Sequence, residues 1–242
     1  MEESKVVAIA GASSGIGEAC ARLFARKGYR VSICARREQL LHEIVGSIRE
    51  EGGKAIAVRA DMSRWDDARR FILTTKDNFG RIDVLFNNAG AGIRYTDFEN
   101  LTVDEIEEGI NVNLKTVLFG CLAVIPVMRE QGKGHIINTT SILGKRARAG
   151  LSVYTAAKHA VDGFSRSLMN EVKKHGIKVS ILGPAMVNTE WARKAGIQAP
   201  FAKTMLEPED VAKAVEFLVE TPEYYSVWSI DLMALGQTID PL

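Results

Sequence analysis

Short apolar runs alternate along this chain with longer segments in which apolar residues recur every three or four positions. Unbroken runs of this length are typical of parallel strands that are covered on both faces. They fall at residues 6–10, 29–34, 54–60, 84–86, 135–141, 178–182 and 228–233. Helical spacing marks residues 18–27, 38–51, 65–79, 102–131 and 209–220, and a helix that contains Tyr154 and extends to about residue 174. Strands that alternate with helices predict an α/β fold on a parallel sheet.

Length and composition favour a single domain. The chain has 242 residues, 46% of them hydrophobic, which is enough for one large core. It contains no repeat, linker or low-complexity block. We therefore interpret residues 1–242 as one domain, in which the mixed apolar segment 190–205 forms a short lid.

The balance of charges and the positions of the cysteines limit the kinds of partner and the cellular location that we expect. Lys and Arg total 31 and Asp and Glu total 30, so no net field attracts nucleic acid or an anionic membrane. Cys20, Cys34 and Cys121 lie far apart in apolar segments, which favours reduced core thiols over disulfides or a metal site. The N-terminus lacks a signal-peptide layout, and the apolar stretch 117–128 is too short to span a bilayer. We expect a cytoplasmic protein with a small-molecule partner and no metal.

A glycine-rich segment joins the first strand to the first helix. Glycines at such a turn let the backbone bend tightly and let a diphosphate approach free N–H groups at the helix start. The alternative is a glycine-rich turn without a ligand, but the strand before it and the helix after it favour nucleotide binding. The candidate contacts are Gly11, Ser13, Ser14, Gly15, Ile16 and Gly17.

Two arginines follow the second strand, where nucleotide-binding α/β folds meet the adenosine ribose. An acid there prefers a free 2′-hydroxyl, whereas an arginine suits a 2′-phosphate. Because Arg36 and Arg37 occupy the position, the sequence favours NADP(H) over NAD(H), with Arg36 as the first candidate. Solvated arginines at a helix start are the alternative. After the third strand, Asp61 and Met62 suit the adenine edge, although Asp61 is equally suited to cap the next helix.

A serine, a tyrosine and a lysine form the candidate catalytic group. Tyr154 and Lys158 share a helix face because they are four residues apart, and Ser141 ends a buried strand. A free tyrosine has a pKa near 10, and shifting it to about 7 needs roughly 4 kcal/mol, which a nearby cation and a charged cofactor ring can supply. The serine would hold a substrate oxygen while Tyr154 transfers its proton. Two ordinary helix-surface residues are the alternative.

The order of these motifs resembles the short-chain dehydrogenase/reductase family over nearly the whole chain. The resemblance is carried by the Gly11 turn, the segment Asn87-Asn88-Ala89-Gly90, Asn113, Ser141 and the Tyr154/Lys158 pair. It implies a Rossmann-type, doubly wound sheet of seven parallel strands with helices on both faces. It also implies a homotetramer or homodimer assembled through the helices that contain Asn113 and Tyr154.

The resemblance further implies a role for each matched residue. Tyr154 would be the general acid/base, Lys158 would lower its pKa and hold the nicotinamide ribose, and Ser141 would orient the substrate oxygen. Asn113, which interrupts a helical pattern, would anchor a water in a proton relay through Lys158. The remaining matched residues lie at the cofactor, and they are Asp61, Asn88, Ala89, Gly90, Pro184, Val187 and Thr189.

Three positions depart from the family pattern. Ala10 replaces a common threonine before the first glycine, Gly183-Pro184-Ala185 replaces the commoner Asn-Pro-Gly, and residues 232–236 lack a common Asp-Gly-Gly ending. Our first hypothesis is an NADP(H)-dependent oxidoreductase that acts on a carbonyl/alcohol pair. The alternatives are a non-catalytic nucleotide-binding scaffold or sensor and, less favoured, an epimerising or dehydrating relative. The substrate remains open between acidic and apolar compounds, because the predicted substrate loops mix charged and aromatic residues.

Overall fold

A twisted parallel sheet forms the centre of the protein in the computed structural model, which describes residues 4–190 and 205–237. Within those residues the sheet has seven strands in the order β3-β2-β1-β4-β5-β6-β7, and every neighbouring pair is parallel. The predicted sheet is therefore confirmed. The strands are β1 Val6–Ala10, β2 Arg30–Ala35, β3 Lys54–Arg59, β4 Val84–Asn87, β5 Gly134–Thr139, β6 Ile177–Pro184 and β7 Ser229–Leu232.

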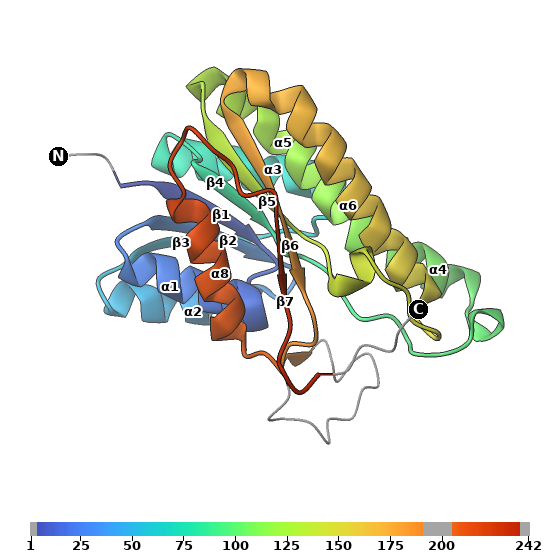
Figure 1. Ribbon diagram of the computed structural model, residues 1–242. Coiled ribbons are helices and arrows are strands. Elements are labelled where there is room, and N and C mark those ends of the chain that lie inside the picture. Colours follow the sequence, from blue (N-terminus) through green and yellow to red (C-terminus); the bar gives the residue numbers. More distant parts are fainter. Residues whose placement is uncertain (1–3, 191–204, 238–242) are drawn as a thin grey trace.

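Helices cover both faces of the sheet (Figure 1). One layer consists of α1 Gly15–Arg26, α2 Glu38–Glu50 and α8 Pro208–Glu220, and the other of α3 Trp65–Phe79, α5 Thr116–Gln131 and α6 Ser152–Val172. Each layer buries its own apolar cluster against the sheet. The strand order reverses beside β1, because β2 lies on one side of it and β4 on the other. Ligands of doubly wound folds bind outside the carboxyl ends of the strands at such a reversal.

The predicted boundaries differ from the observed ones in two informative places. The first helix begins at Gly15 rather than at residue 18, so its N-terminus lies directly in the glycine turn. The long helix expected at 102–131 is divided into α4 Val103–Ile110, a π-helical turn Asn111–Lys115 and α5. The predicted lid at 190–205 falls almost entirely outside the described residues.

The stretch Val103–Gln131 is long and apolar enough to cross a membrane by length and composition alone. In the fold, α5 packs on α3 and contacts β4 and β5. A core helix of a soluble protein can be equally long and apolar. This helix is therefore weak evidence for a membrane protein.

The three cysteines are free and buried, as predicted. Burial raises the pKa of all three thiols, that of Cys121 to about 12. Neutral thiols of this kind pack as small apolar side chains.

Buried polar side chains join β4, β5 and α6. Asn87 Nδ2 donates to Asn138 Oδ1 at 2.9 Å, and Asn138 Nδ2 donates to Ser165 Oγ at 2.9 Å. Asn87, the last residue of β4, thereby ties β4 to β5 and, through Asn138, to α6. Gly120 of α5 lies against this pair, since a Cβ added there would come within 2.2 Å of Asn87 Oδ1.

We expect Gly120→Ala to destabilise the protein by about 1–3 kcal/mol, because the added methyl overpacks a buried polar contact. Gly46→Ala is the matched control, since Gly46 is also inside a helix but has nothing within 4 Å of an added Cβ. The control should gain up to about 1 kcal/mol from helix propensity. Urea unfolding of both variants measures the difference, and a Gly120→Ala protein as stable as the wild type would contradict the packing argument.

One histidine, in strand β5, is buried in the sheet. His135 Nε2 lies 2.8 Å from Ser180 Oγ, its Nδ1 has no hydrogen-bond partner among the described residues, and only 4% of the residue is exposed. Burial, together with the charge of Lys178, lowers the pKa of His135 to about 3. The folded protein therefore keeps this ring neutral where the unfolded chain protonates it.

Acid should accordingly destabilise the fold through His135. Because the folded pKa lies below the unfolded value near 6.5, stability is complete above that value and is lost as the pH falls towards 3. Between pH 7 and pH 5 this amounts to roughly 2 kcal/mol. Urea unfolding at both pH values should show a smaller loss in His135→Gln, whereas exposed His42→Gln should behave as wild type. An unchanged loss in His135→Gln would assign the effect elsewhere.

Candidate functional site

A cavity of about 450 Å³ lies at the carboxyl edge of the sheet. Every predicted catalytic residue and all but one of the predicted cofactor residues line it. They are Gly11, Ser13, Ser14, Gly15, Ile16, Arg36, Arg37, Asp61, Met62, Asn88, Ala89, Gly90, Asn113, Ser141, Tyr154, Lys158, Pro184, Val187 and Thr189. Gly17 does not line the cavity. The structure thus brings residues from the whole length of the chain to one edge.

The glycine turn depends on close backbone approach. The N–H of Gly11 donates to Cys34 O at 2.8 Å, which fixes the turn to β2. Gly11 has a positive φ of 78°, and a Cβ there would meet Ala89 Cα at 2.6 Å. Gly15 has a φ of 60° and faces Thr189. A Cβ at Gly17 would lie 2.3 Å from Gly11 O, so this glycine packs the helix on the turn instead of facing the cavity.

The α1 N-terminus and Arg37 together form a cationic cradle. Ser14 is the N-cap residue of α1, and its side chain caps no backbone N–H. Arg37 donates to Ser13 Oγ at 3.1 Å and to Ser14 Oγ at 2.6 Å, and its Nη1 lies 2.7 Å from Glu190 Oε2. Free N–H groups at a helix start and an arginine beside them suit an anionic diphosphate.

Arg36 lies in a different place from its neighbour. Its side chain is 59% exposed, and its ion pair among the described residues is a long one, at 3.6 Å from Glu108. It lines the main cavity and also the adjoining hollow of about 440 Å³ at the ends of β2 and β3. The sequence treated both arginines as ribose contacts, but the structure places Arg37 over the glycine turn and leaves Arg36 at the rim.

Asp61 does not cap the helix that follows it. Its Oδ1 accepts hydrogen bonds from the N–H and the hydroxyl of Ser63, at 3.0 and 2.7 Å. The N-cap of α3 is Arg64, without a side-chain cap. Of the two interpretations of Asp61, the helix cap is wrong.

Ser141, Tyr154 and Lys158 meet at the centre of the cavity, where each is less than 8% exposed. The Ser141 hydroxyl accepts a hydrogen bond from Leu143 N at 3.2 Å and is hydrogen-bonded to the Tyr154 phenol. Lys158 Nζ donates to Thr139 O at 3.1 Å and lies 5.6 Å from the centroid of the Tyr154 ring. The three side chains therefore lie together in the structure.

The protein groups alone do not lower the pKa of Tyr154. Burial raises it to about 12, against a smaller lowering by the hydrogen bond with Ser141. Burial also lowers the pKa of Lys158 to about 8. The shift towards 7 was expected from a nearby cation together with a charged cofactor ring, so it stays a prediction for the protein with its cofactor bound.

The π-helical turn reveals what Asn113 does locally. Its Nδ2 donates to Gly109 O at 3.1 Å and to Ala91 O at 3.0 Å, and its Oδ1 accepts from Ala91 N at 3.3 Å. The side chain thereby ties the helix to the loop after β4. π-helical turns are rare and often lie at functional sites. A Cβ at Gly90 would lie 3.0 Å from Asn113 Oδ1 and 3.7 Å from Lys158 Nζ.

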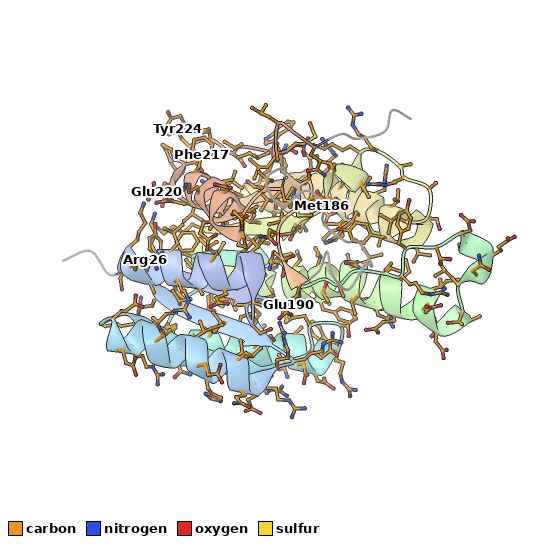
Figure 2. The ribbon with its side chains drawn as sticks, turned by 90° about the horizontal axis from the view of Figure 1, so that it is seen from below. Arg26, Met186, Glu190, Phe217, Glu220 and Tyr224 are labelled. Atoms are coloured by element: carbon orange, nitrogen blue, oxygen red, sulfur yellow. The ribbon has the colours of Figure 1, made fainter. Side chains whose placement is uncertain are left out.

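The loop after β6 closes the cavity on the other side. Ala185 N donates to Leu232 O at 2.7 Å, and Met186 N donates to Gln237 Oε1 at 3.1 Å. In Figure 2 Met186 and Glu190 lie near the middle of the view, away from Arg26 and Glu220, which are the last residues of α1 and α8. Pro184 at the end of β6, and Val187 and Thr189 in this loop, line the cavity.

Several lining groups were not singled out from the sequence. The carbonyl of Thr139 holds Lys158, and Glu190 holds Arg37. Ile142, Met186 and Gln237 also line the cavity. No local motif marks these residues. The signal that could have found some of them is position, since Thr139 ends β5 and Ile142 and Met186 follow β5 and β6 closely. Within the described residues, no group of three or more His, Cys, Asp or Glu side chains is placed to hold a metal ion.

Known proteins share this fold. A family model described as short chain dehydrogenase matches residues 5–199. An uncharacterized oxidoreductase of Listeria innocua is 34% identical, over 99% of this chain and 98% of the relative. An alcohol dehydrogenase from Thermococcus sibiricus, solved with 5-hydroxy-NADP, superposes with a TM-score of 0.91 at 30% identity over 99% of this chain and 100% of that one. A 3-ketoacyl-(acyl-carrier-protein) reductase from Brucella melitensis, solved with NADH, gives 0.88 at 29% identity, covering 96% and 98%.

Fold and site together define a Rossmann-type oxidoreductase. The chain belongs to the short-chain dehydrogenase family.

Proposed function

We propose that the protein is an NADP(H)-dependent oxidoreductase that interconverts a carbonyl and an alcohol. The observation that carries this proposal is that the Ser141–Tyr154–Lys158 group and the glycine turn line one continuous cavity. The hydrogen bond between Ser141 and Tyr154 keeps the two hydroxyls side by side, so that both could contact one substrate oxygen. Our second candidate is a non-catalytic scaffold or sensor. Such a protein would need the glycine turn to bind a nucleotide but would not need the Ser141–Tyr154–Lys158 group.

The chain's own residues suit carbonyl reduction at neutral pH. A phenol whose pKa is raised to about 12 stays protonated, so Tyr154 can donate its proton to an oxygen that gains negative charge. Ser141 would hold that oxygen, and Lys158, held by Thr139 O, would stabilise the phenolate left after proton transfer. The bound dinucleotide would supply the hydride or accept it.

Arg36 is the basis of the NADP(H) preference that we propose. It is exposed beside the ends of β2 and β3, and the described residues give it no closer acidic contact than Glu108 at 3.6 Å. The similar alcohol dehydrogenase was solved with an NADP derivative, whereas the reductase from Brucella was solved with NADH. From the sequence we also propose a cytoplasmic location, a homotetramer or homodimer, a single domain with a lid at 190–205, and a water relay at Asn113.

Replacing Tyr154 by Phe should abolish turnover while leaving nucleotide binding intact. NADPH oxidation with a panel of ketones and aldehydes should fall by at least about 10²-fold, the usual contribution of a positioned acid. Fluorescence titration with NADPH should give a dissociation constant close to that of the wild type. Binding without turnover on any carbonyl in the wild type would favour the scaffold.

The two arginines should respond differently to replacement. Arg36→Ala should weaken NADPH about tenfold or more and NADH little, because only NADPH carries the 2′-phosphate. Arg37→Ala should weaken both nucleotides to a similar degree, because Arg37 lies over the turn that would hold the diphosphate common to both. Calorimetric titration of each variant tests this, and equal losses in Arg36→Ala would refute the 2′-phosphate assignment.

A further inference from the structure

The substrate half of the cavity contains a cation that the proposed chemistry does not use. Arg148 lines the cavity together with Ile142, Leu143 and Leu151, on the side of Ser141 and Tyr154. We propose that Arg148 binds a carboxylate of the substrate, so that the substrate is an oxo acid or a hydroxy acid. This inference rests on the proposed function for its reaction, but not for its binding test.

Charge pairing distinguishes Arg148 from the other arginines of the cavity. Arg37 is paired with Glu190 at 2.7 Å, and Arg36 has Glu108 at 3.6 Å. Among the described residues, Arg148 is the one guanidinium of the cavity lining that has no carboxylate within 4 Å. A charge left without a partner at the wall of a ligand cavity is available to an anionic ligand.

An aromatic ring holds the side chain of Arg148 from one side. The Arg148 Cζ lies 5.8 Å from the centroid of the Tyr95 ring. The contact restricts the guanidinium without using its N–H donors, which remain able to form two parallel hydrogen bonds to a carboxylate. Lysine offers no such planar fork.

The backbone beside Arg148 is fixed as well. Leu151 N donates to Arg148 O at 3.2 Å, and Thr96 N donates to Gly150 O at 3.1 Å. Gly150 has a positive φ of 78°, and a Cβ there would meet the Tyr95 ring at 3.0 Å, so only glycine lets the ring lie so close. Leu151 belongs to the same apolar cluster as Tyr154. The backbone that carries Arg148 is therefore fixed relative to the proton donor, while the Arg148 side chain itself is exposed and rests against the Tyr95 ring.

The matched pair for the test is an acid and its methyl ester. The series would be 3-oxobutanoate, 4-oxopentanoate and 5-oxohexanoate, which place the carboxylate at increasing distance from the carbonyl. For the preferred acid, Arg148→Ala should lower kcat/KM about tenfold or more, mainly through KM, and should change the ester less than twofold. Arg148→Lys should recover only part of the loss. Arg146→Ala is the control, because Arg146 is exposed like Arg148 and lies two positions away but does not line the cavity.

A binding measurement keeps the inference separate from the proposed reaction. The NADP⁺-loaded protein would be titrated calorimetrically with the hydroxy acids of the series and with their methyl esters. We expect at least one acid to bind the wild type about tenfold more tightly than its ester, and Arg148→Ala to remove that difference. Acids that bind no better than esters, or an equal loss for both in Arg148→Ala, would overturn the carboxylate site. Carboxylate-dependent binding without turnover would instead leave the site standing and refute the reaction.

Discussion

Burial of Tyr154 and Lys158 on one helix is the constraint around which the site is built. Both side chains are removed from water, and burial pushes each towards its neutral form, raising one pKa to about 12 and lowering the other to about 8. A buried ammonium is tolerated only where it has hydrogen-bond acceptors. Thr139 O, at the end of β5, provides one. The position of α6 against the sheet therefore decides the chemistry that this pair can perform.

Close packing at this edge of the sheet depends on glycines, which have no Cβ. Gly11, Gly90 and Gly120 each lie where an added Cβ would come within about 3 Å of another group, respectively Ala89, Asn113 and Asn87. These close contacts let the glycine turn, the π-helical turn and the Asn87–Asn138 pair pack directly on their neighbours. The cavity is thus a consequence of close backbone packing as much as of its polar side chains.

Much of this could be predicted from the sequence. The apolar runs gave the seven strands because parallel strands are buried on both faces, and the four-residue spacing of Tyr154 and Lys158 placed them on one helix face. Asn113 stood out because it breaks an apolar helical pattern, and the structure has its irregular turn there.

What could not be predicted depends on contacts between distant segments. Arg37 follows β2 as expected, but its direction is set by Ser13, Ser14 and Glu190, which no local pattern connects. The expected fall in the pKa of Tyr154 counted a neighbouring cation, which sequence spacing reveals, and a charged cofactor ring. Spacing does not reveal desolvation, which depends on how completely the fold encloses the phenol.

The raised pKa and the enclosed site have a common consequence. If the phenol is to donate a proton and regain it, the cost of forming its anion must be offset at the moment of reaction by charges that face it. Ser141 and Lys158 both face Tyr154, and the dehydrated setting that raises its pKa also strengthens their electrostatic interaction with the anion. A site that is unfavourable for the resting phenolate is therefore favourable for brief proton transfer, provided that the cation and the serine are held in place beforehand.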